Sequence, residues 1–283
     1  TLADEFYSAR EKPSHYQAKH KNLVNGFGLS GKHDVNENFS INHSAQFAYD
    51  NMKSSKTIYK NKVEPWNLRQ GDFTDRQYYK ISLLPEYNYS LGEDEEITYK
   101  AGISWDDSNR DKQRFSPVAE INWTRIETNK HSENIYLSYS ESTQVLGYGA
   151  IGGPVDVGTF RSTHDLNRSI SKNLELRLKL KRKNWSLSSA IFHRWDKDLV
   201  DWTYSEPKYT PRIAKHVDID TFGLEIIASR QWDNFQAICS YSYLKKDEDY
   251  KNAKVDGSFY ALNYPVHRAT FGFIWDPIDR LQI

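Results

Sequence analysis

The segment from Leu174 to Lys181 reads Leu-Glu-Leu-Arg-Leu-Lys-Leu-Lys, with apolar and charged residues in unbroken alternation. Successive side chains of a β-strand point to opposite faces, so this strand has one face of leucine and one face of charge. Such a strand needs an apolar environment on one side and water on the other. A soluble β-sandwich provides both, and so does a membrane barrel with lipid outside and water inside.

The same two-residue period recurs along the chain and predicts about eleven strands and no amphipathic helix. The clearest alternating stretches are 39–49, 79–89, 97–105, 119–124, 235–243 and 269–275. No apolar run approaches the roughly 20 residues of a membrane helix. A membrane barrel stays compatible with the low mean hydropathy of -0.79, because alternation hides the apolar half of each strand.

The lengths of the expected connections favour a barrel. Short connections are expected near 32–38, 92–95, 129–132, 182–184, 231–234 and 276–280. Longer ones are expected near 51–76, 107–113, 142–171, 197–216 and 246–265. Short and long connections take turns, as in an up-and-down membrane barrel with short turns on one side and long loops on the other. A Greek-key sandwich has no reason to sort its connections in this way.

Aromatic residues are abundant, with 19 Tyr, 13 Phe and 8 Trp. Five of them are expected near strand ends, where a membrane-interface belt would place them: Trp105, Trp123, Trp185, Tyr243 and Trp275. The alternative is that aromatic residues simply favour strands.

Composition also excludes several kinds of site. Lys plus Arg equals Asp plus Glu at 38 each, which gives no indication of a nucleic-acid partner. Cys239 is the only cysteine, so an internal disulfide and a multi-cysteine metal site are excluded. The nine histidines lack metal-ligand spacing, and the acidic runs 93–96 and 247–249 lack the spacing of a calcium loop. We expect no catalytic residue, no metal and no cofactor, since no nucleophile-elbow motif is present either.

Several motifs in the second half of the chain resemble one family. They are YLSYSES (136–142), DLNR (165–168), NLEL (173–176), WSLSSAIF (185–192), DLVDW (198–202), DIDTFGLE (218–225) and PVHR (265–268). In this order, on alternating strands, they are similar to the strands of TonB-dependent outer-membrane receptors. The chain departs from the family pattern at Leu146, where proline is usual, at Arg168-Ser169, where Pro-Glu is usual, and at Arg177, which replaces a glycine.

The resemblance implies an all-β, antiparallel up-and-down transmembrane barrel of 22 strands, of which residues 1–283 supply about 11 to 12. Neither the plug domain nor the TonB box of these receptors is visible in the sequence, so we expect a partial barrel domain. The implied function is active uptake of a scarce ligand from outside a Gram-negative-type bacterium, such as an iron-siderophore, cobalamin or an oligosaccharide. The implied partners are outer-membrane lipid, the ligand, and a TonB complex acting through a plug domain outside this chain.

Two other hypotheses stay open at this point. The chain could close with a twelfth strand as a small passive porin or adhesin, or it could be a soluble, aromatic-rich protein that binds glycans. The residues expected to contact a ligand lie in the long loops predicted at 142–171 and 197–216, because aromatic and arginine side chains suit polar ligands. They are Tyr148, Phe160, Arg161, Trp202, Tyr204, Tyr209 and Arg212.

Overall fold

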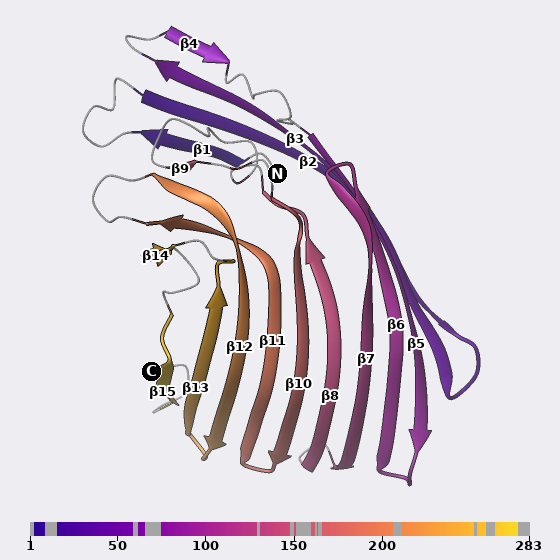
Figure 1. Cartoon of the computed structure of the whole chain (residues 1–283). Helices are drawn as coiled ribbons and strands as arrows, with labels where there is room; N and C mark the ends of the chain where they lie inside the picture. Colours follow the sequence, from indigo (N-terminus) through magenta and orange to yellow (C-terminus); the bar gives the residue numbers. More distant parts are fainter. Residues whose placement is uncertain are drawn as a thin grey trace.

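The computed structural model describes residues 3–8, 16–58, 62–65, 75–128, 131–147, 150, 160–161, 163, 166–205, 211–251, 254–258 and 264–276. These residues form one large curved sheet of antiparallel strands (Figure 1). Within them, no helix has the length and apolar character needed to cross a bilayer.

Twelve strands follow one another across the sheet in chain order, apart from three short strands off this path. The path strands are β1 (Ala3–Ser8), β2 (Tyr16–Asp34), β3 (Phe39–Ile58), β5 (Asp75–Ser90), β6 (Glu95–Ser108), β7 (Asp111–Thr128), β8 (His131–Gln144), β10 (Ser169–Arg182), β11 (Trp185–Tyr204), β12 (Arg212–Gln231), β13 (Phe235–Asp249) and β15 (His267–Trp275). The short strands are β4 (Lys62–Pro65), which pairs with β3, β9 (Phe160–Arg161), which pairs with β12, and β14 (Gly257–Ser258), which pairs with β11.

This architecture confirms the predicted up-and-down all-β fold. The two outermost strands of the path, β1 and β15, do not pair with each other, so the described strands form an open sheet. A closed twelve-stranded barrel would need that pairing, because an unpaired edge in lipid leaves backbone groups without partners. The described strands therefore form an open, curved wall.

Short turns lie at one end of the sheet, which we call the turn end, and most longer connections lie at the other, the loop end. The described turns at the turn end are residues 35–38, 91–94, 183–184 and 232–234. Two expectations for the loop end are wrong in length. The connection expected at 107–113 is a two-residue turn at 109–110. The loop expected at 197–216 is too long, because β11 continues to Tyr204 and β12 already begins at Arg212.

The two faces of the sheet differ in chemistry, and the Leu174–Lys181 segment lies within β10 as expected. Its Leu174 and Leu176 point to a face that also exposes Phe27, Ile81, Leu137 and many other large apolar side chains. The opposite face buries small polar side chains instead, including Ser104, Ser116 and Ser138. Side chains crowd together on the inside of a curve, so the polar face is the concave one and the apolar face is the convex one.

Charges on the concave face are paired across strands. Glu86 of β5 accepts from Lys32 of β2 at 3.1 Å and lies 3.6 Å from Lys100 of β6, which in turn lies 3.4 Å from Glu120 of β7. The amide of Asn42 also donates to Glu86 at 3.2 Å. Glu86 and Glu120 therefore each have a cation within reach, which fits a water-facing wall that carries a network of ion pairs.

Of the five aromatic residues expected near strand ends, only some lie there. Trp185 begins β11 and Trp275 ends β15, but Tyr243 lies in the interior of β13, which continues to Asp249. Trp105 and Trp123 lie three and five residues before the ends of β6 and β7.

One glycine has no room for a side chain. A Cβ added at Gly102 in β6 would lie 2.3 Å from the backbone oxygen of Leu83 and 2.8 Å from Cα of Leu84, both in β5. The β5–β6 pairing lapses between Leu83 and Glu86, where Pro85 has no N–H to donate. The neighbouring backbone thus approaches Gly102 closely, and only glycine fits.

We therefore expect Gly102→Ala to lower the free energy of unfolding by about 1–3 kcal/mol, the usual cost of overpacking. Gly272→Ala in β15 is the matched control, because a Cβ there meets no atom within 4 Å. Equal stability of the two variants in urea unfolding would contradict the close approach of β5 and β6.

Candidate functional site

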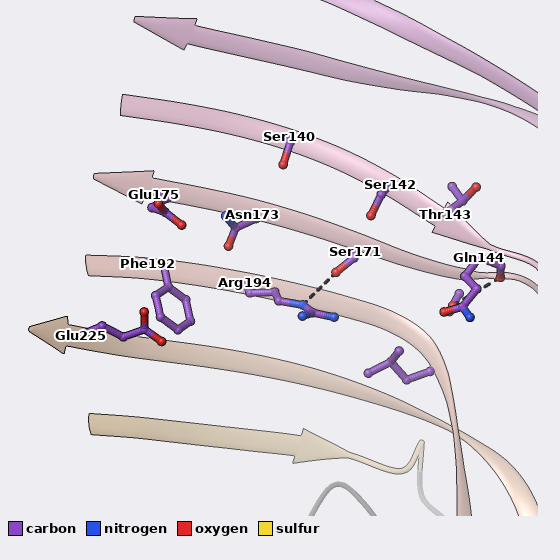
Figure 2. Close-up of a pocket in the computed structure, with 12 residues that line it drawn as sticks. Ser140, Ser142, Thr143, Gln144, Ser171, Asn173, Glu175, Phe192, Arg194 and Glu225 are labelled. Atoms are coloured by element: carbon purple, nitrogen blue, oxygen red, sulfur yellow. Dashed lines mark hydrogen bonds between the residues drawn. The ribbon is translucent and has the colours of Figure 1, made fainter. Parts of the chain in front are cut away.

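A polar groove of about 590 Å³ lies on the concave face near the loop end (Figure 2). Strands β8, β10, β11 and β12 provide its lining residues. The lining residues are Ser140, Ser142, Thr143, Gln144, Ser169, Ser171, Asn173, Glu175, Phe192, Arg194, Leu199 and Glu225. Seven of these carry a hydroxyl or an amide, which can donate and accept hydrogen bonds. The volume falls within the range of roughly 300–1,000 Å³ typical of small-molecule sites.

Most charges of the groove are already neutralised. Arg194 donates through Nε to Asp196 at 2.8 Å and to the Ser171 hydroxyl at 2.9 Å. Glu175 lies 2.8 Å from Arg177. Glu225 makes no ion pair with any described residue, so the wall has a small excess of negative charge. A strongly anionic ligand would gain little from such a wall.

Phe192 provides a flat apolar surface within this polar wall. Its β12 partner in the register is Gly223, and a Cβ added at Gly223 would lie 2.1–2.7 Å from three atoms of the Phe192 ring. The ring therefore rests directly on the backbone of β12, and Figure 2 shows it among the groove side chains. A ring held in this way can stack against a flat apolar part of a ligand while the hydroxyls around it bind the polar parts.

Beyond the groove, β11 and β12 continue as an arm, which we define as residues 199–204 and 212–217. The arm begins where the β11–β12 register shifts between Asp196 and Leu199. There the two strands bend away from the straight part of the wall (Figure 1). A β-bulge increases twist and bends a strand, which accounts for the change in direction.

Two distant connections flank the arm and complete a small four-stranded sheet in the order β14-β11-β12-β9. β9, from the β8–β10 connection, pairs in parallel with β12, and β14, from the β13–β15 connection, pairs antiparallel with β11. Ala214, Val217 and Thr203 of the arm are at most 1% exposed. The arm is therefore a packed unit rather than a free hairpin.

The arm carries most of the described candidate residues. Trp202 and Tyr204 of β11 share a face with Arg212 of β12, whose guanidinium carbon lies 5.9 Å from the Tyr204 ring centroid. Arg161 pairs with Ile213 and faces the other side, and Phe160 contributes its backbone to β9. All of these positions lie in strands, whereas loops were predicted. Tyr148 and Tyr209 lie outside the described residues.

Two arginines hold the ends of the longest connection at the loop end. Arg168, 4% exposed, pairs with Asp106 of β6 and lies 3.3 Å from Asp111 of β7, and its backbone N–H donates to Asp111 at 2.7 Å. On the other side of the connection, Arg76 of β5 donates to the carbonyl of Leu146 at 2.6 Å. Arg168 and Leu146 are two of the departures from the family pattern, and both are buried here.

Sequence reasoning did not identify the groove. Its serines at 140, 142 and 171 alternate with outward-facing residues, and that alternation predicted the strands but not a site. Which lumen-facing polar residues meet across four strands depends on the register, and the register is not visible in any single strand. In the described part of the chain, no group of three or more His, Cys, Asp or Glu side chains is placed to hold a metal.

Comparison with known proteins agrees with this architecture. A family model for TonB dependent receptor-like β-barrels matches residues 3–282. No curated protein matches the sequence. Among solved structures, the copper transporter OprC superposes with a TM-score of 0.66 at 10% identity, over 93% of this chain and 43% of that one.

Two siderophore receptors are also similar. The siderophore receptor PirA from Acinetobacter baumannii has a TM-score of 0.60 at 14% identity, over 94% of this chain and 41% of that one. The ferripyoverdine receptor of the outer membrane of Pseudomonas aeruginosa has a TM-score of 0.54 at 14% identity, over 94% of this chain and 37% of that one. The chain thus spans less than half the length of these proteins, and at such identities the superpositions show the fold alone. Because the family model covers nearly every residue, the chain belongs to the TonB-dependent receptor family and forms part of its β-barrel.

Proposed function

We propose that this chain forms part of the wall of an outer-membrane receptor that takes up a scarce polar ligand. The observation that carries the proposal is the division of one sheet into an apolar convex face and a polar, charge-paired concave face with a groove at its loop end. Lipid matches the first face and a water-filled lumen matches the second. The similar solved structures include a copper transporter and a siderophore receptor, which supports an uptake role of this general kind.

Transport in this account needs no chemistry on the ligand. The groove and the arm bind it, and a TonB complex supplies energy through a plug domain outside this chain. The arm residues Trp202, Tyr204 and Arg212 stay predicted ligand contacts, with Arg161 on the opposite face of the arm.

Among iron-siderophores, cobalamin and oligosaccharides, the groove fits an oligosaccharide best. Its hydroxyls and amides match the hydroxyls of a sugar, and the Phe192 ring offers a surface for the apolar face of a pyranose. The excess charge at Glu225 is unfavourable for an anionic ferric complex. A passive porin is less well supported, because the described sheet does not close on itself.

Binding measurements on the full-length protein test this assignment. The probes are maltohexaose, cellohexaose and xylohexaose as neutral sugars, with ferric enterobactin and cyanocobalamin as the competing classes. We expect one of the sugars to bind, and Phe192→Ala to weaken its binding by about tenfold, the effect of losing one stacked ring. Phe115→Ala is the matched control, because Phe115 is exposed on the convex face.

Binding of ferric enterobactin or cyanocobalamin, with no sugar bound, would contradict the oligosaccharide assignment and leave the receptor role standing. Uptake of the ligand by cells that lack TonB would contradict the active-uptake role itself.

A further inference from the structure

Two residues in an uncommon backbone conformation meet at the base of the arm. Within the described chain, the non-glycine residues with positive φ are Asp198, at 54°, and Lys251, at 52°. Asp198 lies in the β11 bulge, and Lys251 follows the end of β13 by two residues. Their side chains form an ion pair with an Nζ–Oδ1 distance of 2.5 Å. Positive φ is rare outside glycine. Residues in this conformation persist where the surrounding structure holds the strained backbone, and they are concentrated at functional sites.

Further contacts connect this pair to β12 and, through His216, to the residues that precede β10. The Asp198 backbone N–H donates to Asp218 of β12 at 2.8 Å, and Lys251 lies 3.6 Å from the same carboxylate. His216 approaches Asp198 through Nδ1 at 3.4 Å, and its Nε2 accepts from the backbone N–H of Asn167 at 2.9 Å. Since Nε2 is the acceptor, the proton of a neutral imidazole lies on Nδ1 and can be donated to Asp198.

This cluster marks the junction between wall and arm. The β12–β13 pairing ends at Asp218, and the arm runs on past it without β13. Leu199, the first paired residue of the arm, lines the groove and packs against Val217 and Ile219. The angle at which the arm leaves the wall therefore sets the position of one edge of the groove.

We propose that Asp198 and Lys251 form a latch that fixes the angle of the arm and so positions the groove edge for ligand capture. They are positioning residues, which act through Leu199 and the arm rather than by touching the ligand. The link to ligand capture rests on the proposed function, but the latch itself does not. The hydrogen bond to Asp198 raises the pKa of Lys251 above its ordinary value, as expected for an ammonium that gains a carboxylate partner.

Hydrogen exchange of the full-length protein, followed by mass spectrometry, tests the latch without any ligand. We expect Lys251→Gln to speed exchange of the arm amides at 199–204 and 212–217 by about fivefold, with β7 and β8 unchanged. Lys251→Arg keeps the positive charge and is expected to preserve most of the protection. Lys254→Gln is the matched control, because Lys254 is an exposed lysine in the same connection.

Lys251→Gly separates the ion pair from the backbone conformation. Glycine adopts positive φ freely, so this variant removes the charge and the side chain without leaving a strained backbone. The latch predicts fast arm exchange in Lys251→Gly, as in Lys251→Gln. Wild-type protection of the arm in both variants would overturn the latch.

Release of the bound oligosaccharide is the second readout, and Lys251→Gln is expected to accelerate it by about the same factor. A wild-type release rate together with fast arm exchange would overturn the link to ligand capture. Failure of every sugar to bind would count against the proposed function, whereas the exchange result alone decides the latch.

Discussion

Arg168→Ala is expected to lower the free energy of unfolding by about 3–5 kcal/mol, the cost of leaving a buried charge without its partner. The Asp106 carboxylate is 2% exposed and accepts from Arg168 and, at 3.0 Å, from the hydroxyl of Thr143. Without Arg168, the Thr143 hydroxyl is the one hydrogen-bond donor among the described residues that remains for a carboxylate that water does not reach. Asp111 is more exposed and stays solvated, so the loss comes mainly from Asp106.

Arg182→Ala is the matched control at the turn end. The side chains of Arg182 and Glu133 are 33% and 27% exposed, so the pair is screened by water. We expect a loss of about 1 kcal/mol or less. The double variant Arg168→Met with Asp106→Leu should recover most of the stability, because an apolar pair of similar size avoids the cost of an unpaired charge. Similar losses for Arg168→Ala and Arg182→Ala in urea unfolding would show that the Asp106 site is open to water.

Leu176→Arg is expected to cost about 2–4 kcal/mol when the full-length protein folds into lipid bilayers, the cost of a cation on the lipid face at mid-depth. Leu176 is 49% exposed and pairs with Leu137 and Ile191 on the convex face. In a water-exposed sheet the same substitution would change stability by no more than about 0.5 kcal/mol.

Leu180→Arg provides the control for depth. Leu180 lies on the same face of β10, two residues from the strand's end at the short turn. Near the membrane surface an arginine costs only about 0–1 kcal/mol. Equal, small effects of the two arginines would place the convex face in water and contradict the lipid assignment.

The sheet was predictable because alternation is a local signal. In β10 the leucines and the charges occupy opposite faces as their period requires, and neighbouring strands repeat the pattern. The end of β11 was not predictable in this way. Residues 199–204 read as loop in isolation. They are held as a strand by β12 and by β14, which comes from a connection about 55 residues away in the chain.

The same limit applies to the site. Nothing in the sequence around Asp198 signals a bulge, because aspartate only tolerates the left-handed conformation and the Lys251 contact that accompanies it lies 53 residues away. Arg168 was visible only as a departure from the family pattern. Its burial depends on Asp106 and Asp111, which β6 and β7 bring to it from another part of the chain.

A spin-label scan of residues 174–181 tests the two-faced wall most directly. Each position is labelled through an introduced cysteine, in the full-length protein in bilayers and in a Cys239→Ser background, because Cys239 is exposed. The expected result is a period of two, with the four leucine positions accessible to membrane-dissolved oxygen and the four charged positions accessible to a water-soluble nickel complex. Access of the nickel complex to the leucine positions, or the absence of a two-residue period, would contradict a wall with lipid on its convex side and water on its concave side.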